Sequence, residues 1–342
     1  MKSQPLSLKS FIQSDATTNK TLKRSQGASP FSVMVHKEMA DHIRSWRFIV
    51  LIGLIILTFV ASMYVSLSNI RSAMGNTNDP DHAFLYLKLL TITDNSTPPF
   101  HVFLSFLAPL LGISLGFDAI NAEQNSGTLT RLMAQPIYRD NVLLAKFVSA
   151  LIMVGTLFLV LALLMTGGGL ILTGVRMEPQ ELLRILGFMV INITYVGFWL
   201  SLSIVLSIKF RQAATSALTA VGIWLFFTVF YQIIVNLIIR SFLPDPTFLT
   251  QDQILSYNEL ILDILRIAPN QLYTDASTTM LMPSVRSLGP MTMEQMAGAI
   301  PGPLPFRESL MIVWPQVSGL VGATVACFAL SYYLFMRREI RN

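Results

Sequence analysis

The chain has 342 residues, of which 53% are hydrophobic and only 13% are charged. Soluble domains average about 25% charged residues, so this composition indicates an integral membrane protein and excludes an ordinary soluble domain. The formal net charge of +5 bears on membrane orientation and anionic lipid before it suggests nucleic acid. The single cysteine, Cys327, excludes an intramolecular disulfide.

Residues 1–30 are rich in Ser, Thr and Lys and poor in apolar side chains. Such a segment cannot bury enough surface to offset its ordering entropy, so we expect a disordered cytoplasmic tail. A Ser-rich, acid-poor transit peptide is the alternative, although such peptides are Arg-rich and Arg24 is the only arginine here. A cleaved secretory signal is not expected, because no apolar core precedes Phe48.

Residues 31–47 have an amphipathic pattern, in which apolar residues recur every three or four positions and charged residues fill the opposite face. The apolar residues are Phe31, Val35, Met39, Ile43 and Trp46, and the charged residues are Lys37, Glu38, Asp41, Arg44 and Arg47. The pattern predicts an interfacial helix along the inner leaflet, with bases near lipid phosphates and Trp46 at headgroup depth. An amphipathic helix packed on a soluble partner is the alternative.

Six segments are apolar and long enough to cross a hydrocarbon core, which requires about 20 residues of helix. They are residues 48–67, 100–117, 142–175, 182–208, 214–239 and 309–336. The sequence therefore predicts an all-α polytopic membrane protein with six transmembrane helices. The third segment is long enough to tilt or to break, and the glycines at 167–169 and 174 mark where a break is expected.

The distribution of basic residues predicts the orientation of these helices. With six spans both termini lie on one side of the membrane, and that side holds 16 of the 24 Lys and Arg residues. The positive-inside rule places this side in the cytoplasm. We therefore predict a multi-pass protein of the inner (plasma) membrane with both termini and the segment 118–140 in the cytoplasm.

The spans carry few ionisable residues. Asp118, Lys146, Arg184 and Arg240 fall near predicted span ends, where we expect their side chains to reach toward the interface. No proton relay is therefore predicted. No Gly-Lys dipeptide occurs in the chain, so it lacks a nucleotide-binding P-loop, and any ATP would have to be bound by a different polypeptide.

Motifs of enzymes and metal sites are equally weak. The sequence GISLG, which contains Gly112 and Gly116, matches a nucleophile-elbow pattern but falls inside a predicted span. We interpret these two glycines as a close helix-packing motif. The four histidines do not show the spacing of metal ligands. We therefore expect no catalytic residues and no metal site from these motifs.

A short helix is predicted within the polar segment 118–140. Ser126 is a suitable N-cap and Pro136 a stop signal, which leaves about two turns over residues 127–135. Leu129, Leu132 and Met133 would form its apolar face. Such a helix suits insertion into a groove on a soluble partner, and a helix resting on the inner leaflet is the alternative.

This segment resembles the coupling-helix region of ABC-2-type exporter permeases. The resemblance rests on the order Glu123, Gly127, Thr128, Leu129, Pro136 and Arg139, followed by Lys146 at the start of the next span. The segment 31–47 is similar to the gate helix of that family. The similarity extends over nearly the whole chain from Phe31. Within the family it is greatest to the branch of nitrous-oxide-reductase-maturation and gliding-motility permeases.

The resemblance implies a permease without ATPase activity of its own. Two copies, as a homodimer, would pair with two cytoplasmic ATP-binding-cassette subunits, which would hold the ATP and Mg. Leu129, Leu132 and Met133 would be buried in a groove of the ATPase, with Glu123 and Arg139 at its rim. The substrate is not predicted. A force-transmitting membrane subunit acting on an external partner and an ATP-independent channel or carrier are the alternative functions.

Residues 242–308 are predicted to form a helical external loop region before the last span. Thr250 and Gln253 fit a capping box, which predicts an amphipathic helix to about Ile267, before Pro269. Five methionines follow, at positions Met280, Met282, Met291, Met293 and Met296. Flexible methionines that fill packing gaps are the favoured interpretation. A Cu(I) site is the lesser alternative, because Cu(I) prefers thioether ligands.

Overall fold

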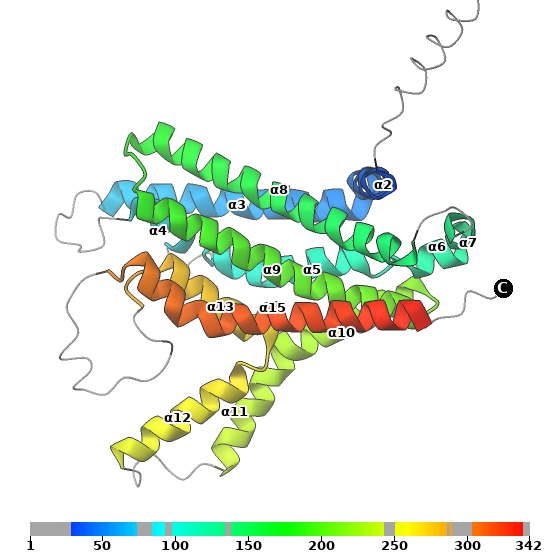
Figure 1. The fold of residues 1–342 in the computed structure, drawn as a ribbon. Helices are drawn as coiled ribbons and strands as arrows, with labels where there is room; N and C mark the ends of the chain where they lie inside the picture. Colours follow the sequence, from blue (N-terminus) through cyan, green and yellow to red (C-terminus); the bar gives the residue numbers. More distant parts are fainter. Residues whose placement is uncertain are drawn as a thin grey trace, which may run out of the picture.

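The computed structural model describes residues 29–73, 84–92, 98–133, 138–242, 250–285, 288 and 303–337. Within these ranges the regular structure is entirely helical (Figure 1). Six stretches are long and apolar enough to cross a membrane, which confirms the predicted all-α fold with six transmembrane helices. They are Trp46–Ser68, Phe100–Asn125, Arg139–Thr173, Pro179–Lys209, Ala213–Ser241 and Phe306–Arg337.

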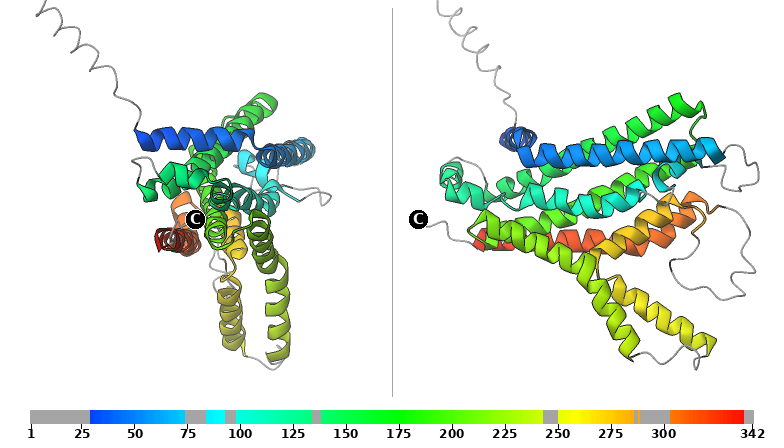
Figure 2. Two further views of the ribbon diagram at one scale, coloured as in Figure 1. Left: turned by 90° about the vertical axis from the view of Figure 1, so that its right-hand side faces the viewer. Right: turned by 180° about the vertical axis from the view of Figure 1, so that it is seen from behind.

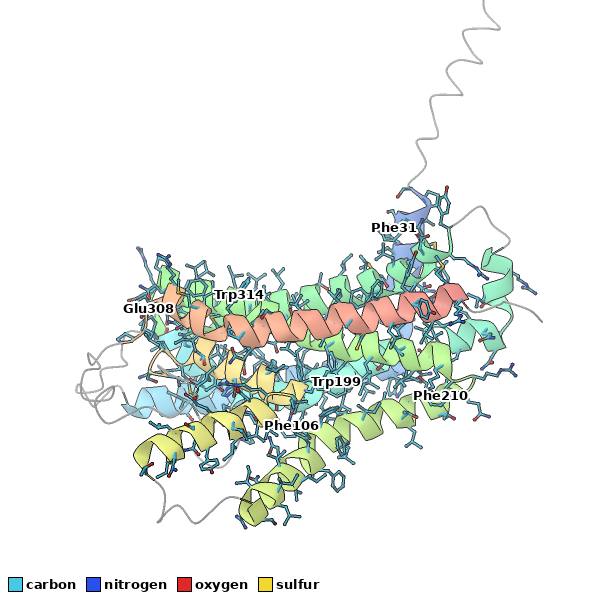
Figure 3. The ribbon with its side chains drawn as sticks, turned by 60° about the horizontal axis from the view of Figure 1, so that its bottom comes forward. Phe31, Phe106, Trp199, Phe210, Glu308 and Trp314 are labelled. Atoms are coloured by element: carbon cyan, nitrogen blue, oxygen red, sulfur yellow. The ribbon has the colours of Figure 1, made fainter. Side chains whose placement is uncertain are left out.

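The helix α9 (Pro179–Lys209) lies at the centre of the bundle, and 78% of its most apolar window is buried. The helices α5 (Phe100–Gly116), α8 (Arg139–Thr173) and α15 (Phe306–Arg337) pack against it. Trp199 of α9 is fully buried between helices, whereas Trp314 of α15 is 65% exposed on the outside (Figure 3). The bundle therefore has one buried central helix and a periphery of apolar faces suited to lipid.

The contact between α5 and α9 depends on the two glycines of the GISLG sequence. A Cβ atom at Gly112 would lie 2.6 Å from the carbonyl O of Val196, and one at Gly116 would lie 2.8 Å from that of Leu200. These distances are too short for any larger side chain without movement of the backbone. The glycines therefore allow the two helices to approach closely, as expected for a small-residue packing motif.

The expected break in the third span is absent, because α8 runs without interruption from Arg139 to Thr173. Gly169 in this helix faces Tyr86 of α4 (Leu85–Thr91), and a Cβ atom there would lie 2.6 Å from the ring of Tyr86. Gly174, with φ of 69°, ends the helix as its left-handed C-cap. The glycines at 167–169 thus do not break the helix, and Gly174 terminates it.

The described part of the region before the last span, residues 250–285, contains two helices, as predicted. The backbone N–H of Thr250 donates to the Oε1 atom of Gln253, 3.1 Å away, in the predicted capping box that begins α12 (Gln251–Leu265). The next helix, α13 (Pro269–Leu281), packs against α9 and α15, with Tyr273 and Ala276 fully buried. Figures 1 and 2 show α12 running back toward the middle of the bundle and α13 returning outward. This pair therefore folds against the spans.

Candidate functional site

One end of the bundle carries three short elements that are not spans. The helix α2 (Pro30–Arg44) lies across this end, nearly perpendicular to the spans, and α6 (Asn121–Asn125) and α7 (Thr128–Met133) lie beside it (Figures 1 and 2). The Oγ atom of Ser29 caps α2 by accepting a hydrogen bond from the Ser32 N–H at 3.3 Å. Ser45, in an extended conformation, separates α2 from α3 (Trp46–Ala73).

A buried cluster of charged residues joins these elements to the start of α8. The Nζ atom of Lys146 lies 2.8 Å from the Oε2 atom of Glu38 on α2 and 2.8 Å from the Oε1 atom of Glu123 on α6. The side chains of Lys146, Glu38 and Glu123 are 7%, 10% and 16% exposed. Lys37, at 52% exposure, extends the cluster outward by contacts of 3.2 Å to Glu38 and 3.8 Å to Glu123.

The electrostatics of the cluster favour the charged forms. Burial alone would raise the pKa of Glu38, but the ammonium groups and hydrogen bonds of Lys146 and Lys37 outweigh it and lower this pKa below its ordinary value. Burial likewise opposes the charge of Lys37, yet the carboxylates of Glu38 and Glu123 raise its pKa. A buried charge is tolerated only when it is paired. The packing of α2, α6 and α8 at this cluster therefore requires all three charged side chains.

Apolar packing supports the same junction. Met34 and Val35 of α2 are buried against Val142 and Ala145 of α8. The predicted apolar face of α2 is therefore partly used within the chain, while Ile43 remains 56% exposed and thus available to lipid. Glu38, predicted on the charged face of the interfacial helix, is buried, because Lys146 of α8 faces it.

A second ion pair links α3 to the end of α5. The Nη1 atom of Arg47 lies 2.8 Å from the Oδ2 atom of Asp118, and the Arg47 guanidinium lies 4.8 Å from the centre of the Phe117 ring. Asp118 and Lys146 were expected to reach toward the interface individually. Lys146 is instead covered by α2 and α6 and paired, and Asp118 is paired with a residue of another span.

The turn between α6 and α7 depends on Gly127. Its φ of 71° lies in the left-handed region, which other residues rarely adopt. Ser126 is the C-cap residue of α6, and its hydroxyl hydrogen-bonds to that of Thr128 at 2.8 Å. The predicted helix is α7, which begins at Thr128, one residue later than expected. Ser126, the expected N-cap, ends the preceding helix, α6, as its C-cap residue.

The residues predicted to contact an ATPase have different environments. Leu129 is only 3% exposed and packs in the chain's own core, so in this structure its side chain is not free to enter a partner's groove. Arg131 and Thr128 are exposed on α7, and Arg139 begins α8. Pro136 and the side chains of Leu132 and Met133 lie outside the described residues. Arg44 and Trp46, of the predicted gate helix, are exposed.

Two further residues tie α6 to the central helix and were missed by sequence reasoning. The Ser207 hydroxyl of α9 accepts hydrogen bonds from the backbone N–H groups of Ile120 and Asn121 at 2.9 and 3.2 Å. The side-chain amide of Asn125 donates to the carbonyl O of Arg211 at 2.9 Å, just beyond α9. A serine late in an apolar span carries no pattern that would reveal such a contact.

The opposite end of the bundle is held by Arg184, which was also expected to reach toward the interface. It is fully buried and donates to the carbonyl O atoms of Met280 and Leu304 and to the Ser309 Oγ at 3.0, 2.6 and 3.0 Å. Its guanidinium therefore connects α9 to α13 and to the start of α15. The side chain is buried and hydrogen-bonded and does not reach toward the interface.

Of the five methionines considered for copper, only Met280 and Met282 lie within the described residues. The Met280 side chain is 1% exposed, and its thioether packs against Gly187. Met282 is half-buried after the end of α13. Met291, Met293 and Met296 lie outside the described residues. Met280 thus fills a packing gap, as the favoured interpretation predicts.

The chain is thus folded as a polytopic membrane protein. At the end that carries α2, α6 and α7, these short helices are joined to the spans by buried contacts. The chain belongs to the ABC-2 family transporter proteins, whose family profile matches residues 33–340. It is therefore a membrane subunit of the ABC transporter type.

Two curated proteins are similar to part of the chain. The probable ABC transporter permease protein NosY of Stutzerimonas stutzeri is 33% identical over 147 residues, which is 40% of this chain and 50% of that protein. The protein of the same name from Pseudomonas aeruginosa is 31% identical over 134 residues, or 38% of this chain and 47% of that protein. The chain thus spans about half the length of the curated relatives it matches.

Proposed function

We propose that this chain is the permease subunit of an ABC-2-type exporter, in which a separate cytoplasmic ATPase drives a substrate across the inner membrane. The observation that carries the proposal is the buried Lys146 cluster, because it joins the short surface helices to a span. The chain itself is not an enzyme in this proposal. ATP and Mg are bound by the ATPase, and a second permease copy completes a homodimer.

The contacts at this end offer a route for mechanical coupling. A push on α7 reaches α6 through the tight turn at Gly127, and α6 is bound to α8 by Lys146 and to α9 by Ser207. The same Lys146 also holds α2. ATP-driven closure of the partner would therefore move α2, α6 and the ends of two spans together, which is how packed interfaces convert small shifts into two-state transitions.

The charge of the exposed residues favours this end as the cytoplasmic one. Arg44, Arg131, Lys209 and Arg211 are exposed here, and their side chains form no hydrogen bond or ion pair with the described residues. Cytoplasmic segments of membrane proteins carry such an excess of bases. The exposed face of α7, with Thr128 and Arg131, is then the surface that meets the ATPase.

The experiment that tests the proposal is co-purification of the chain with the ATP-binding-cassette protein of the same organism. Arg131→Glu should weaken this association, because it reverses a charge at the proposed contact; loss of a hot-spot residue costs about 2 kcal/mol or more, which is roughly thirtyfold in affinity. Substrate-dependent stimulation of ATP hydrolysis in lipid vesicles then measures coupling. We expect substrate to stimulate ATP hydrolysis by the wild-type complex and not by the complex with Arg131→Glu.

Arg176→Glu is the matched control, because Arg176 is an exposed arginine at the opposite end of the bundle. It should leave the association with the ATPase unchanged. ATP hydrolysis by the purified chain alone would contradict the proposal, and so would equal loss of ATPase binding in both variants.

A further inference from the structure

The end of the bundle opposite α2 contains a small polar cavity. Figure 1 shows α4 and the end of α13 in this part of the molecule. A cavity of about 50 Å³ lies between α4 and the residues that follow α13. A single water molecule needs about 10 to 15 Å³, so the cavity has room for a larger polar group. Its polar lining residues are Lys88, Thr91 and Ser284, and Leu281, Met282 and Pro283 are also part of the lining.

Arg184 of α9 lies behind one wall of this cavity. Its Nη1 atom donates to the carbonyl O of Met280 at 3.0 Å, and Leu281, the next residue, lines the cavity. Its Nη2 atom donates to the carbonyl O of Leu304 at 2.6 Å. The N–H of Leu304 in turn donates to the carbonyl O of Pro283 at 3.0 Å, and Pro283 also lines the cavity. The guanidinium is therefore one residue away from the lining at two points.

The charge of Arg184 has no counter-ion among the described residues. The side chain is fully buried, its acceptors are two carbonyl groups and the Ser309 hydroxyl, and its Nε atom has no hydrogen-bond partner. Glu181, one turn earlier on α9, is buried too, but its carboxylate accepts from the N–H groups of Tyr86 and Glu178, each at 2.9 Å. Buried charges are normally paired. This end of the bundle thus has an excess of buried positive charge.

The cavity itself offers donors for an anion. Lys88 contributes an ammonium group, and the Ser284 hydroxyl forms no hydrogen bond with the described residues and can donate. The Thr91 hydroxyl already donates to the carbonyl O of Leu87 at 3.0 Å. No carboxylate is among the described residues that line the cavity. Donors of this kind, with a guanidinium nearby in a medium of low dielectric constant, favour an oxyanion such as phosphate.

We infer that this cavity binds an oxyanion of the phosphate type, with Lys88 and Ser284 as its ligands and Arg184 adding positive charge from behind the wall. The cavity lies at the ends of the spans, where lipid headgroups and the aqueous phase meet. The oxyanion is therefore available from two sources, the phosphodiester of a membrane lipid and free phosphate. The site depends neither on the ATPase nor on the substrate of the proposed exporter.

Thermal unfolding of the full-length chain, purified and delipidated in detergent, tests the site. The probes are dioctanoyl phosphatidylglycerol, inorganic phosphate, and dioctanoylglycerol as the lipid without a phosphate, all at one ionic strength. A ligand that binds only the folded chain raises the unfolding temperature with its concentration. We expect a saturable rise of a few degrees with at least one of the two phosphate-containing probes and none with dioctanoylglycerol.

The two probes distinguish the sources. A rise with phosphatidylglycerol alone identifies a lipid headgroup as the ligand, and a rise with inorganic phosphate shows that a free anion is sufficient. No rise with either, or an equal rise with dioctanoylglycerol, would overturn the inference.

Lys88→Gln assigns the binding to this cavity. Lys88 is only half-buried, so the variant should fold. Loss of a hydrogen bond from a charged group typically lowers affinity by roughly tenfold or more, and we expect such a loss for the probe that stabilises the wild-type chain. Ser284→Ala, at an exposed position, should weaken binding less and without a change of charge, and it provides the test if Lys88→Gln does not fold.

Arg176→Gln is the matched control, because Arg176 is an exposed cation at the same end of the bundle and does not line the cavity. It should leave the affinity unchanged. An equal loss of affinity in Arg176→Gln and Lys88→Gln would show non-specific attraction to the surface and overturn the inference. A lower unfolding temperature of Lys88→Gln with unchanged affinity for the probe would show that Lys88 has a structural role only, and would also overturn it.

Discussion

At the scale of single residues, Lys146 joins three helices at the α2 end of the bundle by its ion pairs with Glu38 and Glu123. Its ammonium group is buried between Glu38 and Glu123, so its removal would leave two carboxylates close together and poorly solvated. Breaking a buried ion pair on one side typically costs about 3 to 5 kcal/mol. The residue therefore matters for stability as well as for the coupling that we propose.

We expect Lys146→Met to lower the thermal stability of the purified chain by an amount in that range. The exposed control, Lys37→Met, should cost less than about 1 kcal/mol, because surface ion pairs are screened by water. Thermal unfolding in detergent measures both. Combining Lys146→Met with Glu38→Gln and Glu123→Gln should recover much of the stability, since no buried charge remains, but it should not restore substrate-stimulated ATP hydrolysis. Recovery of both would show that the cluster is structural only.

The response of Glu38 to pH follows from the direction of its pKa shift. Because its pKa in the folded chain is lowered, its stabilisation is complete above the ordinary carboxylate pKa and is lost as the pH falls through the lowered value. The cluster is therefore intact at neutral pH. Glu38 therefore keeps its ion pair with Lys146 at neutral pH.

The pairing of Lys146 with Glu38 shows why the site was only partly predictable. The two residues are 108 positions apart in the chain, and each fits a local pattern of its own: a basic residue near a span end, and a charged face of an amphipathic helix. Only the crossing of α2 over α8 brings them together. The resemblance to a known family indicated Glu123 and Lys146, and Glu38 as part of the gate helix, but it did not indicate that Lys146 pairs with both carboxylates.

At the scale of elements, local patterns were sufficient where the structure is determined locally. Hydropathy and length located the six spans, and the capping box located the start of α12. The sequence left open whether the third span tilts or breaks, because the close approach of Tyr86 to Gly169 in α8 joins residues distant in the chain. The position of α13 against α9 was also missed, since the contact of Arg184 with the Met280 carbonyl joins residues 96 positions apart in the chain.

The turn between α6 and α7 requires a residue that tolerates positive φ at position 127. Gly127→Val should strain the turn by roughly 1 to 2 kcal/mol, because β-branched residues disfavour positive φ, and should change the direction of α7. Space is not the issue, since a Cβ atom there would have no neighbour within 4 Å. Gly127→Asn is the control, because asparagine tolerates this conformation. Co-purification of the ATPase should fall in the first variant and persist in the second, and equal behaviour would contradict a coupling role for this turn.

At the scale of the whole molecule, one architecture accounts for three observations. The buried cluster and Ser207 fasten α2 and α6 to the spans at one end, and Arg184 fastens α13 to α9 and α15 at the other. The span Ala213–Ser241, in contrast, has only 6% of its most apolar window buried, the lowest share of the six spans. The described chain is therefore a bundle fastened at both ends with one loosely packed span.

The orientation of this body in the membrane can be tested along a single helix. Arg176 precedes α9 and Lys209 ends it, and both are exposed. With 16 of the 24 basic residues on the side that includes Lys209, the positive-inside rule places Lys209 in the cytoplasm. In a Cys327→Ser background, Arg176→Cys should therefore react with a membrane-impermeant maleimide on intact cells. Lys209→Cys should react only after the cells are permeabilised, which also shows that its thiol is accessible. The opposite pattern would invert the topology, place the Lys146 cluster outside the cell and remove it from the reach of any cytoplasmic ATPase.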